Sequence, residues 1–160
     1  MEFILFVASL FLVWAVVALW RAWQLREVEV LSRDEVDLRS RRLGLVGRPD
    51  RLIRLRGGAV IPEEKKSAKQ LYPNLRIQLG VYLLLVEEVY GRRPPYGTLI
   101  LGDNSRYKIR NTFWLRRKVV RLAEKLRRQR TQINKPARVN ATPGQCRSCG
   151  FRGSCGQARL

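Results

Sequence analysis

Histidine is absent from this 160-residue sequence, and cysteine is confined to one short stretch near the C-terminus. Without an imidazole, the sequence excludes every mechanism that needs a histidine base or ligand. The three cysteines lie within ten residues of one another, so they cannot form a disulfide scaffold for a whole domain. Acidic residues are also few, with 13 Asp and Glu against 32 Lys and Arg, a formal net charge of +19. Such an excess on a folded domain indicates a polyanionic partner, either nucleic acid or an acidic lipid surface.

Length and composition limit the architecture. A chain of 160 residues has room for one compact domain and no second full core. Apolar residues make up 46% of it, an ordinary share for a packed core, so intrinsic disorder is excluded. The sequence contains no Walker-type glycine loop, so ATP-driven work is not expected. We predict a transmembrane anchor at 1–23, a connector at 24–42, a core domain at 43–133 and a cysteine-containing tail at 134–160.

The N-terminus carries the longest apolar run. Residues 3–20 contain no charge, and a helix of that length just crosses a hydrocarbon layer of ~30 Å, with Trp20 and Trp23 at an interface. Arg21 and Arg26 follow the run, so the positive-inside tendency places the C-terminal domain in the cytoplasm. The pattern therefore predicts a single-pass membrane protein.

Two other kinds of segment share this composition. A cleaved signal peptide has basic residues before the apolar run and a small-x-small site after it, and this sequence shows neither feature. A core helix buried within the domain is the remaining alternative to a membrane span.

Periodicity and turn residues predict an α/β domain in which helices flank a small mixed sheet. Gly57-Gly58 predicts a two-residue hairpin turn. Ser32 and Glu35 form a capping-box pattern that predicts a short helix in the connector, and Thr112 is a candidate cap for a basic helix. The predicted elements are an extended segment at 43–46, strands at 50–56 and 59–66, a helix at 75–90, strands at 96–101 and 106–110, and a helix at 113–132.

The predicted hairpin carries the most informative residues. Alternation along a strand places Glu64 and Lys66 on one face and Lys65 on the other. Across a two-residue turn Asp50 pairs with Lys65, so its side chain comes within diagonal reach of Glu64. Two carboxylates beside an ammonium group form an oxygen-ligand site for a hard divalent cation, and such a site suits phosphodiester hydrolysis. The alternative is a solvated hairpin edge, where Glu and Lys are common.

Two further patterns lie outside the hairpin. Gln78 and Tyr82 are four residues apart on the predicted helix and therefore share one face. They are candidates for contacting a nucleic-acid backbone or for holding Lys66, and the alternative is a core Tyr82 with a solvated Gln78. The three cysteines are closely spaced thiols, which in a cytoplasmic domain indicate a metal or cluster site and not a disulfide.

Four short motifs occur in a characteristic order, namely GRPD at 47–50, IPEEKK at 61–66, QLGVY at 78–82 and CRSCGFRGSC at 146–155. Over roughly residues 43–156 they resemble the RecB-like PD-(D/E)XK nucleases, and among these the CRISPR-associated exonuclease of the Cas-four type. Each motif alone is weak, but four in sequence with compatible spacing are fairly specific. The resemblance implies a restriction-endonuclease-like core, a small mixed sheet flanked by helices.

The resemblance also implies roles for individual residues. Asp50 and Glu64 would bind Mg²⁺ or Mn²⁺ together with the Lys65 carbonyl, and Lys66 would be the catalytic lysine. The substrate-binding motif that follows would be formed by Gln78 and Tyr82, and the ligands of a [4Fe–4S] cluster by Cys146, Cys149 and Cys155. Members of the family cut DNA, often from single-stranded ends, and some trim new CRISPR spacers. DNA and CRISPR adaptation proteins are therefore the implied partners.

The chain departs from the family pattern in two places. The family's upstream histidine, which contributes to the metal site, is missing, and Glu35 and Asp37 are candidate substitutes. The family cluster takes a fourth cysteine from the N-terminal part, but none precedes Cys146, so the cysteine set is incomplete. The three-cysteine site has three alternatives: a cluster with a non-cysteine ligand, a zinc ion with an outside ligand, or no metal at all.

The sequence as a whole predicts a membrane-anchored, metal-dependent DNA nuclease. Its basic helix at 113–132 would contact phosphate, with a solvated face or anionic lipid as the alternatives for that helix. The alternative from another functional class is a catalytically inactive, membrane-tethered nucleic-acid-binding relative.

Overall fold

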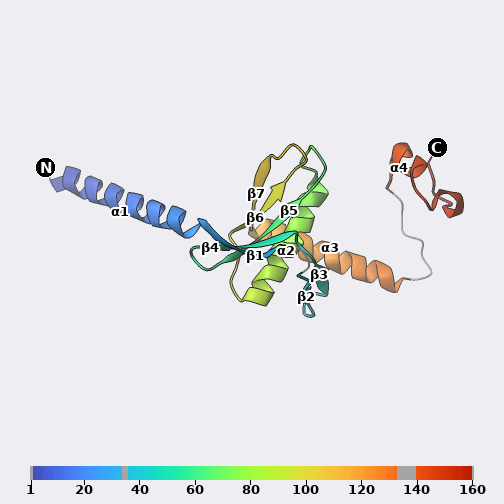
Figure 1. Cartoon of the computed structure of the whole chain (residues 1–160), viewed down its shortest axis with the longest axis horizontal. Coiled ribbons are helices and arrows are strands. Elements are labelled where there is room, and N and C mark those ends of the chain that lie inside the picture. Colours follow the sequence, from blue (N-terminus) through green and yellow to red (C-terminus); the bar gives the residue numbers. More distant parts are fainter. Residues whose placement is uncertain (1, 34–35, 133–139, 160) are drawn as a thin grey trace. The chain divides into compact units, whose positions relative to one another are not determined.

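The computed structural model describes residues 2–33, 36–132 and 140–159 and divides into two compact units, Met1–Ala123 and Glu124–Leu160 (Figure 1). The first unit contains a five-stranded sheet, a two-stranded sheet, two long helices and the first part of a third. In chain order the elements are α1 (Glu2–Gln24), β1 (Glu27–Arg33), β2 (Leu38–Ser40), β3 (Leu45–Gly47), β4 (Arg51–Leu55), β5 (Val60–Lys65), α2 (Pro73–Tyr90), β6 (Tyr96–Ile100), β7 (Arg106–Arg110), α3 (Phe113–Thr131), α4 (Pro143–Arg147) and the 3₁₀ turn η1 (Arg152–Ser154).

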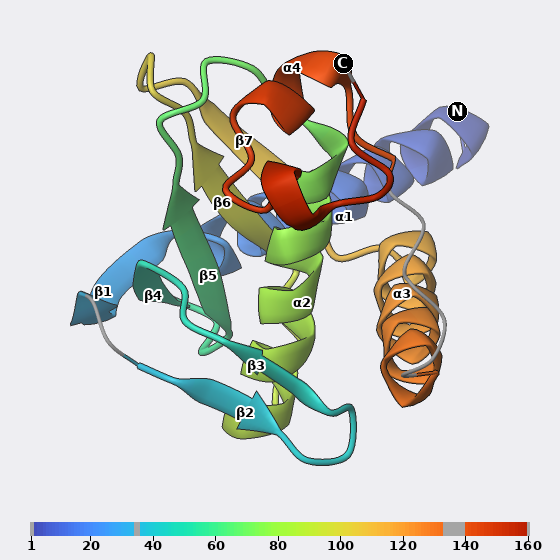
Figure 2. The same cartoon turned by 90° about the vertical axis from the view of Figure 1, so that its right-hand side faces the viewer.

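The main sheet is mixed, as predicted for the α/β class. Its strand order is β1-β4-β5-β6-β7, and every neighbouring pair is antiparallel except the central pair β5–β6. A parallel pair needs a long crossover, and α2 supplies it. Figure 2 shows α2 lying along the sheet, with the small β2–β3 hairpin packed against the same helix. The catalytic candidates therefore lie between the central strands and this helix.

Helix α2 forms because its termini and its apolar face are well specified. Pro73 occupies the first turn, where a missing N–H costs nothing, and Gly91 ends the helix with φ of 67°. Leu79, Leu83, Leu85 and Val86 are fully buried on the helix. Leu79, Leu85 and Val86 form the main core together with apolar residues of β4, β5 and β6.

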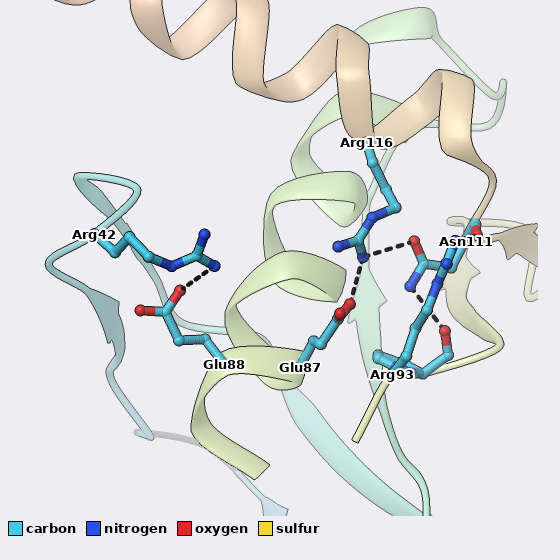
Figure 3. A network of polar contacts seen from close by, with 7 residues as sticks. Arg42, Glu87, Glu88, Arg93, Asn111 and Arg116 are labelled. Atoms are coloured by element: carbon cyan, nitrogen blue, oxygen red, sulfur yellow. Dashed lines mark hydrogen bonds and ion pairs between the residues drawn. The ribbon is translucent and has the colours of Figure 1, made fainter. Parts of the chain in front are cut away.

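Helix α3 packs across α2 at a glycine. A Cβ at Gly80 would lie 2.8 Å from Val119 Cγ2, so only a residue without a side chain permits this approach. Arg116 of α3 forms an ion pair with Glu87 of α2 and also contacts Asn111 (Figure 3). The Thr112 hydroxyl accepts from the Leu115 amide at 3.3 Å, which confirms the predicted cap.

The β4–β5 hairpin forms where predicted but with a different turn. The Leu55 amide donates to the Ala59 carbonyl at 2.8 Å, so the loop has three residues, Arg56 to Gly58, and not the predicted two. Gly58 adopts a φ of 80°, which fits the left-handed position of a three-residue hairpin loop. The register moves by one residue, with Arg51 opposite Glu63, and this places Asp50 next to Glu64 instead of Lys65.

The predicted connector helix is wrong, because residues 27–33 form the edge strand β1. The segment alternates polar and apolar residues and pairs with β4, which outweighs the local capping pattern. Ser32 belongs to this strand, and Glu35 lies outside the described residues. The other predictions agree closely: the strand pair at β6–β7 and the helix α3 are confirmed, and the extended segment at 43–46 overlaps β3.

Helix α1 is long and apolar enough to cross a membrane, over Ile4–Gln24, and none of that window is buried. A signal sequence would meet the same criteria of length and composition. The last turn of α1 leads directly into β1, the edge strand of the sheet.

Candidate active site

The two carboxylates predicted to cooperate lie together at one end of the β4–β5 hairpin. Asp50 precedes β4, and its Oδ2 accepts a hydrogen bond from the Lys65 amide at 2.6 Å. The Asp50 amide in turn donates to Glu64 Oε2 at 3.3 Å. The main-chain groups of both strands therefore hold the two acids side by side, and the three-residue loop is what sets this register.

Lys66 completes the group of charged side chains. Its Nζ lies 2.7 Å from Glu64 Oε1, which confirms that alternation places these two residues on one face. The Glu64 side chain is 5% exposed and that of Lys66 is 27% exposed. The ammonium group therefore reaches solvent while the carboxylate it contacts does not.

Helix α2 presents Gln78 and Tyr82 to the same carboxylate. Gln78 Nε2 donates to Glu64 Oε1 at 3.0 Å and to the Tyr82 hydroxyl at 2.9 Å. Tyr82 is buried, and its ring belongs to the main core. The shared face predicted from the spacing is present, but Gln78 orients Glu64 and not Lys66.

Gly47 is a residue of the site that sequence reasoning missed. A Cβ at this position would lie 2.6 Å from Tyr82 Cε1 and 3.0 Å from Leu85 Cδ1, so a side chain there would displace the Tyr82 ring. The glycine that opens GRPD was the available signal, because a glycine at the end of a strand often marks a close approach of another element.

Burial and charge determine the protonation of the site. Burial raises the pKa of Glu64 above its ordinary value of 4.5. The hydrogen bond from Lys66 lowers this pKa, but by less than burial raises it. Burial alone would lower the pKa of Lys66, but the hydrogen bond and charge of Glu64 raise it above 10.5 overall. Burial also raises the pKa of Tyr82, so its hydroxyl stays neutral at physiological pH. The site at neutral pH therefore holds a protonated lysine.

The donor set fits a small hard cation that retains water. Asp50 and Glu64 supply carboxylate oxygens, and the Lys65 carbonyl faces the Asp50 side because N–H and C=O of an extended residue point the same way. Within the described ranges no group of three or more Cys, Asp or Glu residues could hold a metal. A site with two carboxylates and ordered water is typical of Mg²⁺.

Of the two candidate substitutes for the missing histidine, Asp37 is paired with an arginine instead of the carboxylate site. The Asp37 carboxylate accepts from Arg48 Nε at 2.8 Å, and both side chains are exposed. This hydrogen bond lowers the pKa of Asp37. Glu35 lies outside the described residues.

The three cysteines line one cavity of about 520 Å³ in the second unit, between α4 and η1. All three are free thiols, with Cys146 buried, Cys149 exposed and Cys155 half-buried. They do not form a metal-ligand group in the part of the chain that the structure describes, so the predicted iron–sulfur site is not supported.

Comparison with known proteins gives the family. The model of the PD-(D/E)XK nuclease superfamily matches residues 10–156. Thirteen chains of solved structures match, among them "Crystal structure of SSO0001", at 23% identity and a TM-score of 0.49. That match covers 86% of this chain and 59% of the other, so the chain spans about three fifths of that protein's length. No curated protein matches. Most of the chain lies inside the family match, and two acids and a lysine at the sheet meet a glutamine from helix α2. This chain therefore belongs to the PD-(D/E)XK nuclease superfamily.

Proposed function

We propose that this protein is a membrane-anchored deoxyribonuclease that hydrolyses phosphodiester bonds with Mg²⁺ or Mn²⁺ and prefers single-stranded ends. One observation carries the proposal: the buried Glu64 carboxylate contacts Lys66 at 2.7 Å and lies against the main chain of a second acid, Asp50. Nucleases of this superfamily usually use such divalent metals. The order of the GRPD, IPEEKK, QLGVY and CRSCGFRGSC motifs supports the finer assignment to the CRISPR-associated exonucleases of the Cas-four type.

Asp50, Glu64 and the Lys65 carbonyl are the groups that would hold the cation. When bound, the cation supplies stabilisation of the negative charge that develops on the scissile phosphate. Gln78 keeps Glu64 Oε1 oriented by its hydrogen bond, because its own amide is also bonded to the buried Tyr82. Lys66, held protonated by its neighbours, donates hydrogen bonds to the attacking water or to a phosphate oxygen.

Substrate binding is assigned to basic surfaces of the same unit. Helix α3 exposes Arg117, Lys118 and Arg121 near its start, which suits contacts with a phosphate backbone. The preference for single-stranded ends and the CRISPR adaptation proteins as partners rest on the family resemblance.

The membrane part of the proposal rests on α1. The 21-residue span Ile4–Gln24 contains Arg21 in its last turn, and Arg26 follows it, an arrangement that favours a cytoplasmic nuclease domain. The predicted anchor at 1–23 and core domain at 43–133 are part of this proposal.

The decisive experiment is a cleavage assay of the full chain in detergent, on end-labelled single-stranded DNA with Mg²⁺, Mn²⁺ or EDTA at a stated salt concentration. We expect cleavage with either metal, none with EDTA, and loss in Asp50→Asn. Asp37→Asn is the matched control, since the exposed Asp37 carboxylate is paired with Arg48, and it should cleave normally. A wild-type protein that binds DNA but never cleaves it would instead identify the inactive, tethered binding protein.

A further inference from the structure

The end of helix α1 is attached to the tip of the β4–β5 hairpin. The Gly57 amide donates to the Gln24 carbonyl at 2.9 Å, and the Arg56 amide donates to the Arg26 carbonyl at 2.8 Å. The Arg56 guanidinium lies over the Trp23 ring, 4.8 Å from its centroid. The hairpin tip and the start of the sheet are therefore located where α1 leaves the domain.

Two other loops reach the same end of the sheet. The hydroxyl of Tyr96, the first residue of β6, lies 3.5 Å from the Leu25 carbonyl. The loop before β6 is bonded to the β7–α3 junction, because the Asn111 amide donates to Pro95 and Arg93 donates to the Asn111 carbonyl (Figure 3). Helix α3 then begins two residues later. The segments 56–58, 91–95 and 111–114 thus share the end of the domain nearest α1, which we call the α1-proximal end.

The composition of the α1-proximal end is that of a membrane interface. Its exposed side chains are arginines and aromatic rings, with Trp114 the most exposed ring at 74%. Glu27 adds a carboxylate at this end, and Glu87 adds another that is paired with Arg116. The cations are Arg21, Arg26, Arg56, Arg92 and Arg93, and the exposed rings are Trp20, Trp23, Phe113 and Trp114. Arginines bind anionic headgroups, and tryptophans concentrate at the headgroup level of a bilayer.

We infer that the α1-proximal end rests on an anionic bilayer, with Trp114 and the arginines of the 56–58 and 91–95 loops in the headgroup region. This inference depends on the proposed membrane anchoring, because a spanning α1 brings this end of the sheet to the headgroups. The positive charge of the α1-proximal end is complementary to anionic lipid, and its loops lie next to the end of α1. The loops themselves, and not α1 alone, therefore contact lipid.

The orientation has a consequence for the carboxylate site. Glu64 lies four residues beyond Val60, the first residue of β5, about 13 Å at the usual rise per strand residue. Seating the hairpin tip on the bilayer therefore holds Asp50, Glu64 and Lys66 away from lipid. The site stays open to a nucleic acid on the aqueous side.

Tryptophan fluorescence in vesicles tests this surface. The chain has four tryptophans, so Trp14, Trp20 and Trp23 changed to Phe leave Trp114 as the single emitter. The full chain is reconstituted into vesicles of phosphatidylcholine and phosphatidylglycerol with brominated acyl chains, and co-flotation reports anchoring. We expect Trp114 emission to be quenched, and quenching to weaken in pure phosphatidylcholine vesicles or in the Arg56→Glu, Arg92→Glu double variant.

A second single-tryptophan chain is the matched control. Trp114→Phe with Tyr72→Trp moves the emitter to the start of α2, near the far end of the sheet, where it is exposed and should not be quenched. Co-flotation without quenching of Trp114 would overturn the bilayer contact and leave the anchor intact. Failure to co-float would remove the anchor as well. If single-stranded DNA changes the Trp114 emission and brominated lipid does not, this end of the domain binds nucleic acid instead.

Discussion

Glu63 and Glu64 are adjacent on β5, both are buried, and the strand directs them to opposite faces of the sheet. Glu63 contacts two guanidinium groups, Arg106 at 2.7 Å and Arg51 at 3.4 Å. Two cations surround one carboxylate there, so its charge is neutralised by the protein itself.

The Glu64 side of the sheet has the opposite balance. There, one ammonium group and one amide contact Glu64, and the second acid, Asp50, is held against Glu64 through its main chain. A site with more negative than positive charge attracts a cation, whereas the group on the other face, with two cations to one carboxylate, does not. Neighbouring charge, more than burial, distinguishes the two glutamates, and it is the basis for proposing Glu64 as the cation ligand.

The largest expected effect follows from removing the Glu64 charge. Glu64→Gln should lower metal-dependent cleavage by about 1,000-fold, because the cation loses a carboxylate ligand worth several kcal/mol in the transition state. Circular dichroism should show an unchanged fold, since Gln can still accept from Gln78. Residual cleavage near the wild-type rate would show that Glu64 is as structural as Glu63.

Replacing the lysine should give the next largest effect. Lys66→Gln removes the protonated donor, so cleavage should fall about 100-fold. The hydrogen bond from Lys66 lowers the pKa of Glu64, so its loss should raise that pKa further above 4.5. Protons then compete with the cation at higher pH.

Mn²⁺ binding measured by electron paramagnetic resonance against pH checks this sign. The acid limit of binding should move to higher pH in Lys66→Gln, while Lys69→Gln, an exposed lysine in the following loop, leaves both cleavage and the pH profile unchanged. An acid limit that moves to lower pH would contradict the assigned pair.

A smaller effect, on stability alone, is expected on the other face. Glu63→Gln should lower the free energy of unfolding by about 2 kcal/mol, because two arginines lose a buried charged partner but still reach solvent. Cleavage per folded molecule should stay at the wild-type rate. Urea unfolding and the cleavage assay on one preparation distinguish a loss of stability from a loss of catalysis. A loss of catalysis in Glu63→Gln would show that the two glutamates do not differ in role.

The smallest expected effect comes from the tyrosine behind Gln78. Tyr82→Phe removes one hydrogen bond and should cost about 1 kcal/mol of stability. Gln78 keeps its bond to Glu64, so the cleavage rate should change less than about threefold, equivalent to well under 1 kcal/mol. A large loss of cleavage with normal stability would place the hydroxyl on the substrate.

Much of this arrangement could be read from local patterns. The period of two along a strand places Glu64 and Lys66 on one face, and the spacing of four along a helix places Gln78 and Tyr82 together. Gly91 and Thr112 mark helix ends through chemistry within one turn. Each of these features depends on residues close in the chain, so the sequence suffices to predict them.

The errors have a common physical origin. The capping pattern at Ser32 was outweighed by pairing with β4, an interaction between segments about 20 residues apart. Gly57-Gly58 indicated a turn, but whether two or three residues form the loop depends on which register packs the strands best. That difference of one residue is what places Asp50 beside Glu64.

By itself the sequence determined an α/β chain with an apolar N-terminal helix, a basic domain and the set of residues able to form a cation site. Only the tertiary structure decided which groups surround Glu64. The crossing of α2 over β5 brings Gln78 onto Glu64, and the space left by Gly47 admits the Tyr82 ring. Such contacts join residues more than a dozen positions apart, and close packing, not local propensity, selects them.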